Sequence, residues 1–201
     1  MYDAGKLLPN SFYQRPVAVV ALDLLGRCLR HGSVLLRITE VEAYGGLEDS
    51  ASHCRSGRNA RNAPMWEDGG FAYVYVCYGM HHMLNFVTGP AGAGSAVLVR
   101  ACEPIHGLEI IRERRGWLEG PALLTGPGRV AQALALDRSF NGQPLYEAGG
   151  LEVREGEPPE GLLKGPRIGV PYAAPLDREA ALRFAVVGSA WVAERKRLSR
   201  V

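Results

Sequence analysis

Apolar side chains recur along this chain with two periods, and each period predicts a different kind of element. Between residues 16 and 30 the apolar positions are spaced like one face of a helix: Val17, Val20, Ala21, Leu24, Leu25 and Cys28. Pro16 stands where a helix readily begins, because its φ angle already suits the first helical turn. Over residues 33–44 the apolar positions alternate instead, which predicts a strand.

The rest of the chain repeats these two patterns in clusters. Further strands are expected in FAYVYVCYGM (71–80), HMLNFV (82–87) and SAVLVRAC (95–102), with shorter ones near RIGV (167–170) and in LRFAVVGSAWVA (182–193). Helices are expected in GLEIIRERRG (107–116) and GPGRVAQALALD (126–137). Because the strands cluster rather than alternate with helices, we predict one compact α+β domain over residues 1–201, with a mainly antiparallel sheet and surrounding helices.

Composition narrows the class of protein. The 201 residues are 47% hydrophobic and 22% charged, which is typical of a folded domain, and the formal net charge of +2 is too small to identify a partner. The four cysteines lack metal-binding spacing, so we expect free thiols, with Cys28 and Cys77 in the core, and no metal site. No signal pattern or membrane-length apolar stretch occurs, which predicts a cytoplasmic protein with no membrane contact, associated with the nucleoid if it is bacterial.

Two carboxylates break the pattern of the strand at residues 33–44. The alternation that begins with apolar residues continues into Glu40, Glu42 and Tyr44, so it aims the core side of the strand at two acidic groups. Buried carboxylates are costly unless they are paired or hydrogen-bonded. His53 follows after a short loop, and a carboxylate held near a water in a partly dry site can act as a general base. A solvated or arginine-paired Glu42 is the alternative.

Tyrosines suggest a site for a flat ligand. In the strand at residues 71–80, alternation places Tyr73, Tyr75 and Cys77 on one face. Tyr73 fits simple core filling, yet the four tyrosines at positions 44, 73, 75 and 78, near one carboxylate, together suit a pocket that stacks a planar ring.

A basic loop follows the carboxylates. In HCRSGRNARNAPMW, Arg55, Arg58 and Arg61 occur with no acidic residue between them. The loop is either a mobile, solvated segment or an edge that contacts DNA phosphates. The adjacent His81 and His82 would point to opposite faces of a strand and could not chelate one metal together. A flat-ring pocket, a water-activating carboxylate and a basic rim are the parts that an enzyme needs to act on a base flipped out of duplex DNA.

Six ordered segments also resemble a known family. ITEVEAYGGLEDSASH, GRNARNAPMW, AYVYVCYGMHHMLN, VLVRACEPIHGLE, GPGRVAQAL and GSAWV are similar to successive segments of the 3-methyladenine (alkyladenine) DNA glycosylases, over nearly the whole chain. The resemblance implies a curved sheet, no cofactor, a monomer, and duplex DNA containing damaged purines as partner. It implies a monofunctional glycosylase that removes the damaged purine in base excision repair and leaves an abasic site.

The same resemblance assigns the chemistry. Glu42 falls where the family has the carboxylate that activates the attacking water. Arg100 matches an arginine that holds the target phosphate and the water, and Val170 matches a residue whose backbone carbonyl faces the water. No family role attaches to Glu40, which we interpret as a structural or paired group.

Further matches concern the base and the duplex. Tyr44, His53 and Tyr75 fall where the family stacks the flipped base and contacts its edge, and Asn85 matches a residue that rejects normal guanine. Tyr78 matches the side chain wedged into the gap that the flipped nucleotide leaves. The sequence departs from the family in a slightly shorter basic loop and in the histidines of GMHHM, so the range of lesions beyond 3-methyladenine stays open.

Two other functions are compatible with parts of this pattern. A non-catalytic binder of damaged DNA would need the arginines but no water-activating carboxylate. A nucleoside hydrolase would need the carboxylate, but neither the basic loop nor the wedge tyrosine, since a free nucleoside offers no duplex to hold open.

Overall fold

All the strands of the computed structural model, which describes residues 5–201, belong to one sheet. The nine strands in that range are β1 (Cys28–His31), β2 (Val34–Tyr44), β3 (Ala72–Cys77), β4 (His81–Thr88), β5 (Ser95–His106), β6 (Glu152–Arg154), β7 (Leu162–Gly165), β8 (Arg183–Val186) and β9 (Ser199–Arg200). Their order is β3-β4-β5-β2-β8-β7-β9, with β1 joining β2 to β6, and the recorded pairings between these strands are antiparallel. The predicted α+β class with an antiparallel sheet is confirmed.

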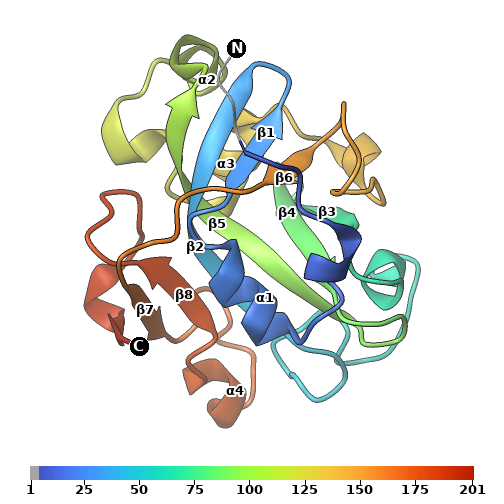
Figure 1. Cartoon of the computed structure of the whole chain (residues 1–201). Helices are drawn as coiled ribbons and strands as arrows, with labels where there is room; N and C mark the ends of the chain where they lie inside the picture. The colour runs from blue at the N-terminus through green and yellow to red at the C-terminus, as the bar shows by residue number, and fades with distance from the viewer. Residues whose placement is uncertain (1–4) are drawn as a thin grey trace.

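Two long central strands organise the molecule. β2 and β5 run side by side through its middle, and β3 and β4 extend the sheet from β5 (Figure 1). The strands predicted at residues 33–44, 71–80, 82–87 and 95–102 correspond to β2, β3, β4 and β5. The strand predicted at residues 167–170 is wrong: that segment is a loop, and the neighbouring strand is β7, earlier in the chain.

Short helices cover the sheet. They are α1 (Val17–Leu24), α2 (Leu108–Arg114), α3 (Pro127–Ala133) and α4 (Pro175–Glu179). Short 3-10 turns lie at Asn10–Phe12, Ala63–Trp66, Gly120–Leu123, Arg138–Phe140 and Arg195–Arg197. Pro16 immediately precedes α1, as predicted, but the helical stripe does not continue to Cys28. Leu25 is already extended, with ψ at 130°, and Gly26, with a φ of +85°, then lets the chain turn into β1.

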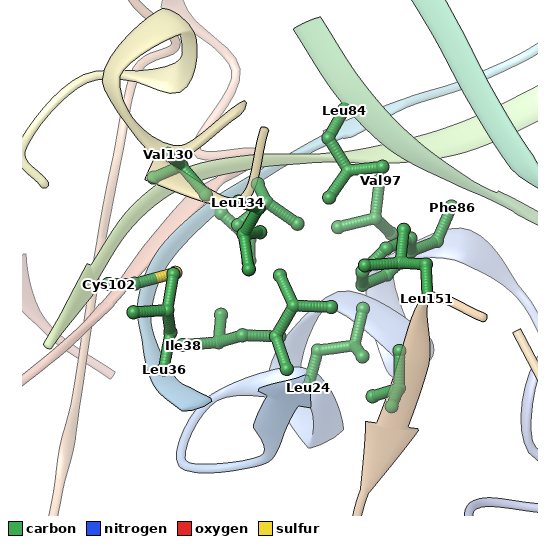
Figure 2. Close-up of a cluster of buried hydrophobic side chains, with 14 of the residues drawn as sticks. Leu24, Leu36, Ile38, Leu84, Phe86, Val97, Cys102, Val130, Leu134 and Leu151 are labelled. Carbon is green, nitrogen blue, oxygen red and sulfur yellow. The ribbon is translucent and has the colours of Figure 1, made fainter. Parts of the chain in front are cut away.

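The main core lies between one face of the sheet and the helices. Figure 2 shows Leu24 of α1 and Val130 of α3 directed toward side chains of β2, β4 and β5. Each such large apolar side chain contributes roughly 1.5–3 kcal/mol when fully buried. Cys102 belongs to this core, and Cys54 is also buried, whereas Cys28 and Cys77 are only partly buried. The expectation that Cys28 and Cys77 are core residues is therefore wrong, because each lies at an end of its strand.

An irregularity in β2 decides which way the two carboxylates point. Ile38 pairs with Cys102, Glu40 with Ala101 and Val41 with Val99, so the register shifts on both sides of Glu40. Such a bulge exchanges the two faces of a strand. The main core accordingly contains Ile38 before the bulge and Val41 and Ala43 after it.

Glu40 and Glu42 therefore do not face the main core. The expectation that alternation carries them onto the core side is wrong, because the bulge transfers them to the opposite face of the sheet. Arg100 of β5 lies beside the same irregularity, between the paired residues Ala101 and Val99. Within residues 5–201 no helix is long and apolar enough to cross a bilayer.

Candidate active site

A cavity of about 520 Å³ lies on the sheet face that carries the carboxylates. Its walls come from the ends of β2 and β3, from β4 and β5, and from two loops, residues 45–70 and 166–174. Of the eleven residues assigned to the site from the sequence, eight line it: Tyr44, His53, Arg61, Tyr75, Tyr78, Asn85, Arg100 and Val170. The volume is in the range of small-molecule sites and accommodates one nucleobase.

Glu42 lies immediately behind the wall of this cavity. It is 0% exposed, and its carboxylate accepts hydrogen bonds from three donors. The Ile168 backbone N–H reaches Oε1 at 2.7 Å, while the Tyr44 hydroxyl and Arg100 Nη1 reach Oε2 at 2.8 and 3.2 Å. All three donor residues line the cavity. An ionised carboxylate offers about four acceptor positions, so roughly one stays available to a water.

Arg100 is itself held by two carboxylates. Its Nε donates to Glu40 Oε1 at 3.2 Å while its Nη1 contacts Glu42. Although burial alone would lower it, the pKa of Arg100 is raised by the carboxylates of Glu42 and Glu40. Glu40 also accepts from Arg183 and from the Ala193 backbone, which confirms the interpretation of Glu40 as a paired group.

A second buried ion pair, between Arg167 and Asp49, holds Tyr44 and Ile168, the other two hydrogen-bond donors to Glu42. Arg167 is paired with both oxygens of Asp49, with Nη2 to Oδ1 at 2.8 Å, and its guanidinium lies 4.8 Å from the centre of the Tyr44 ring. Arg167 also precedes Ile168 in the chain, so one cation fixes both the aromatic ring and the backbone N–H that contact Glu42. Burial, reinforced by the Glu42 charge, raises the pKa of Tyr44 and keeps its phenol a donor.

His53 stands between two tyrosines of β3. Its Nδ1 is 3.0 Å from the Tyr73 hydroxyl, and its ring meets the Tyr75 ring edge-on at 4.6 Å. Burial, with the nearby Arg61 and Arg55 cations, lowers the pKa of His53 to about 4. The imidazole is therefore neutral at physiological pH and can both donate and accept a hydrogen bond. Tyr73 is buried as expected, but core filling is not its whole role, because it also orients His53.

The basic loop is folded around Asn62. This buried amide donates to the His53 and Gly57 carbonyls and accepts from the Asn59 N–H and Trp66 Nε1. The interpretation of the loop as merely mobile and solvated therefore does not fit its hydrogen bonding.

The three arginines of the loop occupy different places. Arg61 lies over the Tyr75 ring at 5.3 Å, inside the cavity wall, and Arg55 lies over Tyr172 at 5.2 Å. Arg58 points outward and pairs with Glu67 at 2.6 Å on the exposed surface. Of the three, Arg61 alone lines the cavity.

Tyr78 projects from the turn between β3 and β4. It is 87% exposed, lines the cavity and has a φ of +52°, a left-handed conformation that costs a non-glycine residue roughly 1–2 kcal/mol. The neighbouring Met80 is 70% exposed. Strained backbone of this kind clusters at functional sites, so Tyr78 is retained as a candidate site residue.

Asn85 on β4 and Val170 on loop 166–174 both line the cavity. Asn85 donates through Nδ2 to the carbonyls of Tyr73 and Met83. The Val170 carbonyl accepts from the Ala173 N–H at 3.1 Å. The cross-strand neighbours Asn85, Leu98 and Glu42 form one row across three strands.

Sequence reasoning missed several residues of the site. Tyr172 lines the cavity and donates to the Ala51 carbonyl at 2.9 Å, and Ile168 acts through its backbone. Neither carries a local signal, because loop 166–174 is held at the site by long-range contacts, among them the pairing of Arg167 with Asp49. Within residues 5–201 no group of three or more His, Cys, Asp or Glu side chains is arranged to hold a metal ion.

Comparison with known proteins gives consistent results. Residues 11–190 match the family model described as methylpurine-DNA glycosylase. A protein of Nitrosococcus oceani, provisionally named as a 3-methyladenine DNA glycosylase, is 54% identical over 192 residues, which cover 96% of each chain. The DNA-3-methyladenine glycosylase of Arabidopsis thaliana is 48% identical over 193 residues, covering 95% of this chain and 76% of that protein. A provisionally named Methanoculleus marisnigri relative is 43% identical over 196 residues, covering 94% of this chain and 99% of that protein.

The cavity is lined by aromatic residues, lies on an antiparallel sheet and has a hydrogen-bonded carboxylate behind it. Together with the family match, this site defines the protein as a DNA glycosylase, an enzyme that hydrolyses N-glycosyl bonds. More particularly, the family model covers most of the chain, so the chain belongs to the methylpurine-DNA glycosylase family. The family assignment made from the six sequence segments is confirmed.

Proposed function

We propose that this glycosylase removes alkylated or otherwise damaged purines, 3-methyladenine among them, from duplex DNA. The damaged nucleotide flips into the cavity, and a water activated by Glu42 hydrolyses its glycosidic bond and leaves an abasic site. The observation that carries this proposal is the buried Glu42 carboxylate, held by three donors directly behind an aromatic cavity. The substrate named for the Arabidopsis relative supports the choice of lesion.

The position of Glu42 suits two tasks in this reaction. As the purine leaves, positive charge develops on the sugar, and a nearby carboxylate stabilises it. The same carboxylate accepts a proton from the attacking water. Because Glu42 has no exposed surface, the water enters from the cavity, past Tyr44, Arg100 and Ile168.

The cavity walls suit the flipped base. Tyr44, Tyr75 and the neutral His53 offer ring faces and edges, and base–aromatic stacking contributes about 1–3 kcal/mol per base. A cationic alkylated purine gains further attraction to the aromatic rings. Tyr78, exposed at the cavity mouth, fills the gap in the duplex, and Arg61 meets the phosphates beside it.

A base-release assay tests the proposal. The intact protein is mixed in excess with two duplexes of identical sequence, one carrying a single 7-methylguanine and one an unmodified guanine, and the released base is measured. We expect release from the damaged duplex alone, with an intact abasic strand and a protein that elutes as a monomer. DNA binding is measured in parallel at a stated salt concentration.

The other outcomes favour the alternatives. Binding without release from any alkylated duplex would contradict the proposal and favour a non-catalytic binder of damaged DNA. Equal release from the damaged free nucleoside would favour a nucleoside hydrolase, because the wedge and the arginines would then contribute nothing.

A further inference from the structure

A second carboxylate is buried beside Glu42, and the proposed mechanism does not use it. Glu40 is 0% exposed and accepts hydrogen bonds from Arg100 Nε and Arg183 Nη1, each at 3.2 Å, and from the Ala193 N–H at 2.7 Å. Glu40 does not line the cavity. A purely structural role would not require a charged side chain at this position, because apolar side chains can replace buried ion pairs without loss of stability.

The guanidinium of Arg100 contacts both carboxylates. Its Nε contacts Glu40 and its Nη1 contacts Glu42, at equal distances of 3.2 Å. A guanidinium shared in this way neutralises each carboxylate less than it would neutralise one alone. Arg183 supplies the balancing positive charge from the far side of Glu40.

We propose that Glu40 is a positioning residue that keeps Glu42 basic, because it draws part of the Arg100 charge away from Glu42 and anchors the Arg100 guanidinium. The proposal rests on the proposed function of Glu42 as the group that activates water. Glu40 acts on the reaction only through Arg100 and through its own negative charge.

The ionisable and charged groups around Glu42 come from every element packed against it. On the strands, these neighbours are Glu40 and Tyr44 of β2, Arg100 of β5 and Arg183 of β8, which is the cross-strand partner of Glu42. On loop 166–174 they are Arg167 and Tyr172. The nearby carboxylate of Asp49, on loop 45–70, is paired with Arg167 and is unchanged in the variants, so removal of the Glu40 charge changes the balance around Glu42 in one direction.

The sign of the effect follows from this set. Without the Glu40 charge, Arg100 serves Glu42 alone and the like-charge repulsion disappears, so the carboxylate of Glu42 is more fully neutralised and accepts a proton from water less readily. Removing the Arg183 charge has the opposite effect, because Glu40 then draws Arg100 more strongly toward itself.

Single-turnover base release between pH 4.5 and 8.5 tests the proposal. The substrate is a duplex with one 7-methylguanine, whose leaving base is already cationic and needs no protonation, so the acidic limb of the profile reports the general base. For Glu40→Gln we expect this limb to move down by about one pH unit and the plateau rate to fall about ten-fold. Rates are normalised to the concentration of DNA-binding-competent protein, so partial unfolding does not imitate the effect.

Two further variants separate charge from shape. Glu40→Asp disturbs the same contacts but retains the charge, and its acidic limb should stay at the position found for the intact protein. Arg183→Met should move the limb upward, which keeps the proposal testable if Glu40→Gln fails to fold. An unmoved limb in Glu40→Gln, equal shifts in Glu40→Gln and Glu40→Asp, or a downward shift in Arg183→Met would each overturn the proposal.

The failure of the proposed function gives a different result. If the intact protein releases no base, or if Glu42→Gln retains full release, the role of Glu42 fails and the acidic limb no longer reports it. If release depends on Glu42 but not on the charge of Glu40, only the role of Glu40 fails.

Discussion

Replacing Arg167 with methionine removes a buried cation while retaining most of its volume. Arg167 is 2% exposed, is paired with Asp49, donates to the Ala43 carbonyl at 3.0 Å and lies over the Tyr44 ring. In Arg167→Met, the carboxylate of Asp49, itself 7% exposed, keeps only the N–H groups of Gly45 and Ala51. The variant therefore leaves a buried charge without a counter-charge.

The magnitude follows from that missing counter-charge. Removing one partner of a buried ion pair costs roughly 3–5 kcal/mol, whereas an exposed pair contributes about 0–1 kcal/mol. For a chain of this length a loss of 3–5 kcal/mol corresponds to a fall in Tm of roughly 6–20 °C. The matched control is Arg178→Met, which breaks the exposed pair of Arg178 with Glu179 and should shift Tm by no more than about 4 °C.

Urea unfolding followed by circular dichroism measures both variants at pH 7, with the slope of the transition checked for constancy. The double variant Asp49→Asn with Arg167→Met should recover part of the loss, because no unpaired charge then remains. A loss below about 1 kcal/mol in Arg167→Met, or no recovery in the double variant, would refute the reasoning that this ion pair clamps loop 166–174 to the site.

Three further results are expected. His53, whose pKa is lowered to about 4, should show no NMR titration between pH 5 and 8. Because the folded protein binds fewer protons at His53 than the unfolded chain does, the free energy of unfolding should fall as pH drops from about 6.5 to 4. An NMR titration midpoint near 6.5 for His53 would contradict this prediction. Tyr78→Gly relieves the strain of the positive φ, so its free energy of unfolding should stay within about 1 kcal/mol of that of the intact protein. Its rate of base release from duplex DNA should nevertheless fall at least about ten-fold, and an unchanged rate would exclude a wedge role for Tyr78. Asn62→Ala removes four hydrogen bonds and should lower the free energy of unfolding by about 2–4 kcal/mol. Trypsin should then cleave faster at Arg58 and Arg61, and an unaltered rate of cleavage would mean that Asn62 does not order the loop.

Alternation and spacing predict the elements but not their irregularities. The strands at residues 33–44 and 71–102 follow from their apolar patterns, and these strands with the turn between β3 and β4 carry about half of the residues that line the cavity. The bulge at Glu40 carries no such pattern, because the shift depends on how β2 pairs with β5. Strict alternation therefore assigned Glu42 to the wrong face, although the family resemblance had already given it a chemical role.

Long-range contacts account for the rest of what the sequence could not show. Ile168 binds Glu42 through a backbone N–H, a group that every residue except proline carries and that no residue pattern distinguishes. Asp49 and Arg167 are 118 positions apart in the chain, and neither segment alone indicates that they meet. The strand predicted within residues 182–193 corresponds to β8, whereas β7 is only four residues long and carries too little alternation to be located from the sequence.

The most direct test of the central claim is single-turnover base release by Glu42→Gln from a duplex with one alkylated purine. Glu103→Gln, which alters a partly exposed carboxylate on β5, is the matched control. The account predicts that Glu42→Gln loses release by about 10²-fold or more while it still binds the duplex, and that Glu103→Gln releases base at the rate of the intact protein. Release by Glu42→Gln at the rate of the intact protein would contradict the account, because the buried carboxylate would then have no part in the reaction.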